Sequence, residues 1–186
     1  FIKTGGEEAQ GASTITQQLL KNTVFTDWTS EGSNKIKKIK RKIQEQYLAL
    51  EITKYYSKDE ILLRYMNAIN LGQNTLGVES ASLRYFGKHC SDLTLSECAV
   101  IASITQNPSK YNPISHPDKN AERREKVLNN MKEQGMISQA EYDEAMADDV
   151  YSRIATVNEE VEDKSVFTYF VDALTEQVLE DLMEVK

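Results

Sequence analysis

The sequence predicts an all-α protein, and three observations indicate that class. Apolar residues recur at helical spacing through most of the 186 residues, capping boxes precede several of these runs, and strand-type alternation is scarce. In a capping box, a hydroxyl and a carboxylate satisfy opposite ends of the first helical turn. The boxes are Ser57-Lys-Asp-Glu60, Thr94-Leu-Ser-Glu97 and Ser138-Gln-Ala-Glu141.

Eight helices are expected, and turn-forming glycines and Asn-Pro pairs separate them. The best candidate for strand-type alternation is the segment Val150–Val157. The expected helices cover residues 13–25, 34–56, 58–69, 76–86, 95–105, 118–134, 139–147 and 168–184.

Charge divides the chain into two parts. Residues 1–140 carry 19 lysines and arginines against 15 acidic residues, whereas residues 141–186 carry 3 against 14. An anionic ligand therefore belongs with the first part, and the acidic tail argues against nucleic acid as a partner of the whole chain. We expect a main domain over residues 1–147, and a connector and helix leading towards a further domain over 148–186.

The composition is that of a globular protein, with 40% apolar and 27% charged residues. No apolar run approaches the roughly 20 residues that a membrane-spanning helix needs, so we expect the chain to be soluble. Two cysteines cannot build a disulfide scaffold. Cys90 and Cys98 could pair outside the cell, but Cys98 falls on an apolar helical face, where a buried thiol is at least as well supported.

The helix that begins near Ser13 carries a polar arc suited to binding oxygen-rich ligands. Its start offers unpaired backbone N–H groups and the positive end of the helix dipole. Hydroxyl, amide and ammonium groups beside that end suit sugar hydroxyls and phosphate oxygens. A capped surface helix with a polar side explains the same spacing. The residues on the arc are Ser13, Thr14, Gln17, Gln18 and Lys21.

The next helix begins with the basic run Lys35-Ile-Lys-Lys-Ile-Lys-Arg-Lys42. Lysines surround an apolar stripe, which is the usual pattern of a solvated face. The same pattern suits a surface that meets anionic lipid headgroups or a pyrophosphate. The apolar stripe consists of Ile36, Ile39, Ile43, Tyr47 and Leu50.

Glu45 lies where this helix changes character. It follows Arg41 by four residues and Lys42 by three, so the three side chains share a face and the two cations favour the carboxylate. One turn later Leu48 and Ile52 occupy that face, which predicts that the helix enters a core. An ordinary surface salt bridge, worth about 0.3–0.5 kcal/mol, fits the spacing equally well.

Several segments in order resemble the peptidoglycan glycosyltransferases of family 51, the transglycosylase module of class A penicillin-binding proteins and monofunctional transglycosylases. Gly11–Gln18 resembles the second motif, Arg41–Glu45 the third, and Ser57–Asn67 the segment that follows it. Gly77–Lys88 resembles the fourth motif and Leu93–Pro113 the fifth. The order holds from about residue 11 to 147.

The resemblance implies a lysozyme-like fold and the polymerisation of lipid II into β-1,4 glycan strands, with inversion and release of lipid pyrophosphate. It implies lipid II, the growing lipid-linked glycan and the bacterial membrane surface as partners, and a transpeptidase domain in some parent proteins. The reaction would take place at the outer face of the bacterial plasma membrane. A divalent metal, Mg²⁺ or Mn²⁺, often assists the departure of the pyrophosphate in this family.

The resemblance also implies roles for individual residues. Glu45 matches an essential glutamate near the pyrophosphate, where it orients Arg41 and Lys42 or helps to hold a metal. Lys88 is a weaker candidate for the same cleft. Ser13, Gln18 and Lys21 match the helix that contacts the donor, with Thr14 and Gln17 beside them. Structural roles are expected for Asn67, Tyr85, Phe86 and Glu97.

The sequence departs from the family pattern at the first motif, an acidic pair near a Phe and a His that supplies the general base. Neither Glu7 nor Glu8 lies in such a pattern, so we expect little or no turnover by this polypeptide alone. A non-catalytic helical module that binds a membrane or a partner is the alternative. A lysozyme-type hydrolase ranks lower, because it needs a protonated acid and the two cations favour a carboxylate.

Overall fold

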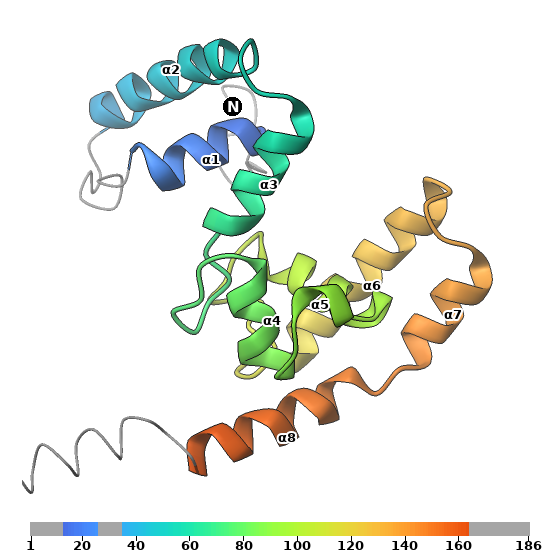
Figure 1. Ribbon diagram of the computed structural model, residues 1–186. Coiled ribbons are helices and arrows are strands. Elements are labelled where there is room, and N and C mark those ends of the chain that lie inside the picture. The colour runs from blue at the N-terminus through green and yellow to red at the C-terminus, as the bar shows by residue number, and fades with distance from the viewer. Residues whose placement is uncertain (1–12, 26–34, 164–186) are drawn as a thin grey trace, which may run out of the picture. The chain divides into compact units, whose positions relative to one another are not determined.

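The computed structural model describes residues 13–25 and 35–163, and the regular structure in these ranges is helical (Figure 1). The predicted all-α class is confirmed. Within the described ranges, strand-like pairing is limited to a single antiparallel bridge between Asn70 and Leu76. The chain divides after Ser80 into two compact units.

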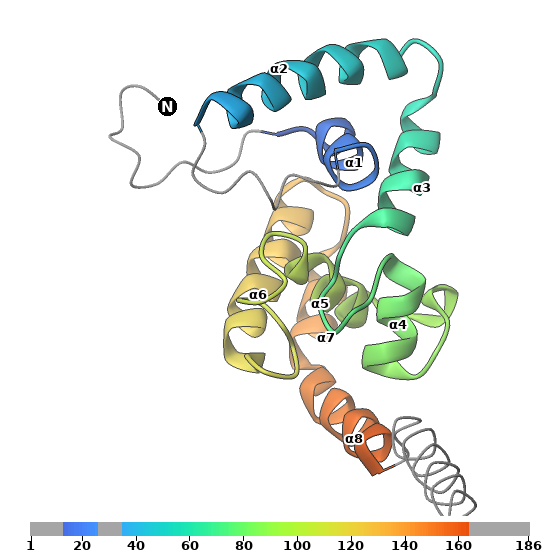
Figure 2. The ribbon, with the colours of Figure 1, turned by 90° about the vertical axis from the view of Figure 1, so that its left-hand side faces the viewer.

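The first unit is built around α1, which packs against both α2 and α3 (Figures 1 and 2). Leu19 and Leu20 form the buried side of α1. The predicted capping box of Ser57 and Glu60 is present at the start of α3. The helices are α1 (Ile15–Thr23), α2 (Lys35–Ile52) and α3 (Lys58–Ala68).

The loop after α3 requires a glycine at position 77. Gly77 has a φ of +84°, and a Cβ placed on it would lie 2.8 Å from the backbone oxygen of Asn67. The Asn67 side chain donates a hydrogen bond to the carbonyl of Leu63 in the last turn of α3. The structural role expected for Asn67 at a helix end is therefore confirmed.

The second unit is organised around α5, which packs against α6 and α7. Helix α5 is apolar on most sides, and Val100 and Ile104 are fully buried in it. Tyr85 and Phe86 at the end of α4 are buried, as predicted for structural aromatic residues. The elements are α4 (Val78–Phe86, which spans the division between the units), the short 3₁₀ helix η2 (Cys90–Asp92), α5 (Leu95–Ile104), α6 (Pro117–Glu133), α7 (Gln139–Ala147) and α8 (Val150–Asp163).

The predicted strand over 150–157 is wrong, because this segment begins α8. Val150 and Ile154 are buried one helical turn apart, so their spacing suits a helix. These two residues supply the buried side of α8. The helix predicted over residues 168–184 lies outside the described residues.

The expectation that α2 enters a core holds for the side of the helix on which Glu45 and Ala49 are buried, with Leu48 and Ile52 half-buried. Tyr47 and Leu50, which belong to the apolar stripe, are exposed. Cys98, for which the sequence left a buried thiol as one alternative, is exposed. Cys90 is exposed as well, and the two cysteines do not form a disulfide.

Candidate active site

A cluster of three charged side chains lies on one face of α2. Glu45 is completely buried, with an exposed fraction of 0%. One of its oxygens accepts a hydrogen bond from Arg41 Nη1, and the other lies 2.7 Å from Lys42 Nζ. The spacing of three and four residues along α2 brings the groups together, as the sequence predicted.

Lys42 extends this cluster to the start of α1. Its Nζ donates a hydrogen bond of 2.9 Å to Ser13 Oγ, which lies 29 residues earlier in the chain. The Lys42 side chain is 43% exposed, so its ammonium group remains accessible. An ammonium has three N–H donors, and Ser13 and Glu45 use two of them. Lys42 therefore keeps a donor for an oxygen of a ligand.

The cluster carries one more positive charge than negative. Glu45 holds the two cations in fixed positions, and Arg41 is mostly covered, with a side-chain exposure of 12%. Fixed cations stabilise negative charge without the cost of reorganising when that charge develops. The arrangement of Arg41, Lys42 and Ser13 suits a ligand that presents several anionic or hydroxyl oxygens.

Gln18 connects α1 to α3. Its Nε2 donates to the backbone oxygen of Ser13 at 3.3 Å, and its Oε1 accepts from the hydroxyl of Tyr65 at 3.3 Å. Sequence reasoning missed Tyr65 as a site residue, since its helical spacing suggested only an apolar contact. Lys21, in the last turn of α1, is partly exposed.

Thr14 and Gln17 form a capping box at the start of α1. Thr14 Oγ1 accepts from the backbone N–H of Gln17 at 3.3 Å, and Gln17 Oε1 accepts from the backbone N–H of Thr14 at 3.2 Å. Their side chains thus satisfy the helix end, which is the capping alternative that the sequence left open. Contact of these two residues with a substrate stays a prediction.

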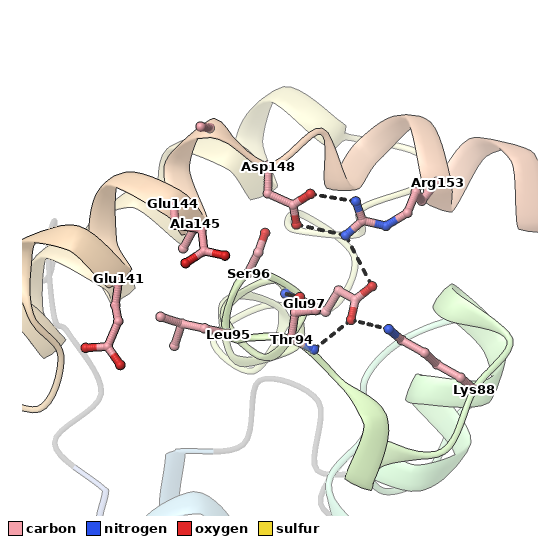
Figure 3. A pocket seen from close by; sticks show the side chains of 11 residues that line it. Lys88, Thr94, Leu95, Ser96, Glu97, Glu141, Glu144, Ala145, Asp148 and Arg153 are labelled. Atoms are coloured by element: carbon pink, nitrogen blue, oxygen red, sulfur yellow. Dashed lines mark hydrogen bonds and ion pairs between the residues drawn. The ribbon is translucent and has the colours of Figure 1, made fainter.

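Lys88 lies in the second unit, where it pairs with a buried acid. Its Nζ lies 2.7 Å from the carboxylate of Glu97, which also accepts from Arg153 at 3.2 Å (Figure 3). Arg153 in turn pairs with Asp148 at 2.6 Å. Glu97 also accepts from the backbone N–H of Thr94, so the expected capping role of Glu97 is confirmed. The assignment of Lys88 to the donor cleft stays a prediction.

This network determines the ionisation of Glu97. Burial alone would raise the pKa of Glu97, but the hydrogen bonds from Lys88 and Thr94, the charge of Lys88 and the hydrogen bond from Arg153 together lower it. The hydrogen bond from Arg153 likewise lowers the pKa of Asp148. Neither Arg153 nor Asp148 was singled out from the sequence, because the contacts of Arg153 with Glu97 and Asp148 depend on the position of α8.

The described residues do not fit a divalent metal site. Both oxygens of Glu45 already accept hydrogen bonds from cations, so a metal would have to displace Arg41 or Lys42. In the ranges that the structure describes, no three His, Cys, Asp or Glu side chains are grouped to hold an ion. Among the same residues, none of the helices is both long and apolar enough to span a membrane.

The family model and the curated relatives that match this chain agree with one another. The family model described as Transglycosylase matches residues 2–132. Penicillin-binding protein 1A of Clostridium botulinum strain Langeland is 44% identical over 179 residues, which cover 93% of this chain and 21% of that protein. Penicillin-binding protein 1A of Aquifex aeolicus is 38% identical over 97% of this chain and 23% of its own length.

A further relative is Penicillin-binding protein 1F of Bacillus subtilis, which is 44% identical over 136 residues. That match covers 73% of this chain and 18% of the relative. The chain thus spans about a fifth of the length of the curated relatives that it matches.

Proposed function

Because this chain belongs to the transglycosylase family, we propose that the protein that carries it is a peptidoglycan glycosyltransferase of bacterial cell-wall synthesis. The donor is a growing glycan attached to lipid pyrophosphate, and the acceptor is the 4-hydroxyl of an incoming lipid II. The bond between the anomeric carbon and the pyrophosphate oxygen breaks, and a β-1,4 glycosidic bond forms with inversion. The acceptor hydroxyl gives its proton to a general base, which the family resemblance assigns to the first motif, and the lipid pyrophosphate leaves with the electron pair of the broken bond.

One observation carries this proposal: Lys42 Nζ lies within hydrogen-bond distance of both Ser13 and the buried Glu45. A pyrophosphate gains negative charge as it leaves, and the Lys42 ammonium has a donor to offer it. Glu45 acts by fixing Lys42 and Arg41 in the positions where that charge appears. Both Glu45 oxygens are engaged by these cations, so Glu45 acts here without a metal.

The exposed side of α2 supports a membrane surface as a partner. Lysines flank its apolar stripe, and Ile36 is 80% exposed and Leu50 is 69% exposed. Apolar side chains flanked by lysines suit the interface of an anionic bilayer, where lipid-linked substrates are found. In this proposal α2 lies on the outer face of the plasma membrane. A transpeptidase domain in the full-length protein belongs to the same proposal.

The test is polymerisation of fluorescent lipid II by the full-length protein, with glycan strands separated on a gel. The Glu45→Gln variant should lose at least about a hundredfold in rate, because Gln keeps the shape but releases the two cations. Glu51→Gln is the matched control, since Glu51 lies on the same helix in an exposed pair with Lys54. Circular dichroism should show both variants folded.

A folded Glu45→Gln variant with full activity would reduce the cluster to a structural salt bridge. A wild-type protein that makes no glycan but binds vesicles would favour the alternative, a non-catalytic module that binds a membrane or a partner. The exposed apolar stripe of α2 is the observation that supports this alternative.

A further inference from the structure

We propose that Tyr65 is a positioning residue of the transferase site, which orients the carboxamide of Gln18 and, through it, Ser13. The inference rests on the proposed function, because it gives Tyr65 a part in holding the groups that receive the pyrophosphate. Tyr65 lies on α3, whereas the charged cluster lies on α2. Its effect on that cluster therefore passes through α1.

The contacts form a continuous chain across three helices. The Tyr65 hydroxyl donates to Gln18 Oε1 at 3.3 Å, and Gln18 Nε2 donates to the Ser13 carbonyl at 3.3 Å. The Ser13 hydroxyl accepts from Lys42 Nζ at 2.9 Å, and the same Nζ lies 2.7 Å from Glu45. The two sets of hydrogen bonds meet at Ser13, whose carbonyl accepts from Gln18 and whose hydroxyl accepts from Lys42.

Both hydrogen bonds of the Gln18 carboxamide form only in one orientation of that group. The Ser13 carbonyl can only accept, so Gln18 must present its NH₂ group there and its oxygen towards Tyr65. The Tyr65 hydroxyl serves as the donor that this orientation needs. Burial raises the pKa of the Tyr65 phenol, which keeps it protonated at neutral pH. The second N–H of the Gln18 amide then remains for an oxygen of the donor substrate.

Without the Tyr65 hydroxyl, the Gln18 oxygen would lose its hydrogen-bond donor, and the amide would be held only by its contact with the Ser13 carbonyl. A rotated amide would present its oxygen to the Ser13 carbonyl, and these two acceptors repel each other. Ser13 lies directly before Thr14, the residue that caps α1. Loss of the Tyr65 hydroxyl should therefore loosen Ser13 and, with it, the position of Lys42.

The test is a double-mutant cycle with Tyr65→Phe and Gln18→Ala, measured by lipid II polymerisation with the full-length protein. Tyr65→Phe should lower kcat/KM about threefold to tenfold, mainly by raising KM, because it removes one hydrogen bond and keeps the ring. In the Gln18→Ala background the same substitution should have no further effect. Tyr55→Phe, which alters an exposed tyrosine outside the cluster, is the matched control.

A merely structural tyrosine would give a different pattern. It would lower Tm and act additively with Gln18→Ala, and either result overturns the proposal. An unchanged KM in the Tyr65→Phe variant of an active enzyme also overturns it.

A second readout separates this proposal from the proposed function. If the wild-type protein makes no glycan, the proposed function fails, and Tyr65 is then judged by the binding of inorganic pyrophosphate to the chain in calorimetry. A Kd about threefold or more higher in Tyr65→Phe supports positioning. An equal Kd, or no binding to the wild-type chain, overturns it.

Discussion

Lys42 Nζ lies 2.9 Å from Ser13 Oγ, and this contact ties the basic face of α2 to the first residues of α1. A long lysine side chain with a half-exposed end usually samples many rotamers, which costs binding free energy when a ligand arrives. Ser13 restricts Lys42 before a ligand is present. The contact therefore preorganises a cation that would otherwise move.

Replacing Ser13 by Ala should weaken the binding of inorganic pyrophosphate about threefold to tenfold, because Lys42 loses the contact that restricts it. Stability should change by less than about 1 kcal/mol, since the contact is partly exposed. Calorimetric titration and chemical denaturation measure the two effects. Ser80→Ala, which alters an exposed serine of α4, should change neither quantity. Equal affinities in Ser13→Ala and wild type would contradict a preorganising role.

Substitution of Gly77 by Ala should destabilise the first unit by about 1–3 kcal/mol. The new Cβ would lie 2.8 Å from the Asn67 carbonyl oxygen, and alanine disfavours a φ of +84°. Gly135→Ala separates the two causes, because Gly135 has a φ of +71° with nothing within 4 Å of a Cβ. Urea denaturation should give a clearly larger loss for Gly77→Ala. Equal losses would mean that backbone strain alone sets the cost.

Helical spacing predicted the local part of the site but not the contacts between helices, for a physical reason. Arg41, Lys42 and Glu45 meet because three and four residues make one helical turn, which any helix fixes. Two other contacts, between Lys42 and Ser13 and between Tyr65 and Gln18, depend on how whole helices pack. The periodicity of the sequence carries no information about helix packing. The family resemblance, rather than spacing, placed Ser13 near Glu45.

Helix α8 shows the limit of propensity within the fold. The β-branched residues of its first turns favoured a strand, yet burial of apolar side chains one turn apart stabilises a helix there. Val150 and Ile154 are 0% and 1% exposed. Tertiary packing thus decided a segment whose local preference pointed the other way.

Ile154→Ala should therefore cost about 2–4 kcal/mol of stability, because it removes buried methylene groups and leaves a cavity under α8. Thermal and chemical unfolding followed by circular dichroism measure this loss. Thr156→Ala provides the control, since Thr156 is an exposed residue of the same helix. A loss below about 0.5 kcal/mol for Ile154→Ala would show that α8 contributes little to the stability of the unit.

The stability of the second unit should fall on acidification. Because the folded-state pKa values of Glu97 and Asp148 lie below their unfolded values, their stabilisation is complete above the unfolded values and is lost as pH falls through the folded ones. The unfolding free energy should therefore decline from about pH 5 to pH 3. Urea denaturation at a series of pH values measures this slope.

Lys88→Met tests whether the Glu97 network causes the slope. Without Lys88, the buried Glu97 carboxylate loses a partner at 2.7 Å, so the variant should be less stable at pH 7 and its stability should depend less on pH. Lys126→Met, at an exposed position of α6, should keep the wild-type slope. An unchanged slope in Lys88→Met would assign the acid sensitivity to other carboxylates.

The apolar stripe of α2 should control binding to lipid vesicles. Replacing Ile36 and Ile39 by Ser should weaken binding to phosphatidylglycerol vesicles at least about tenfold, because each isoleucine transfers apolar area from water to the bilayer. Leu76→Ser with Met136→Ser is a matched pair of exposed apolar residues away from α2 and should leave binding unchanged. Co-sedimentation measures both variants. Vesicles of phosphatidylcholine should bind the wild-type chain more weakly, since the lysines of α2 then meet no net negative charge. Equal binding by the two double variants would show that another surface meets the membrane.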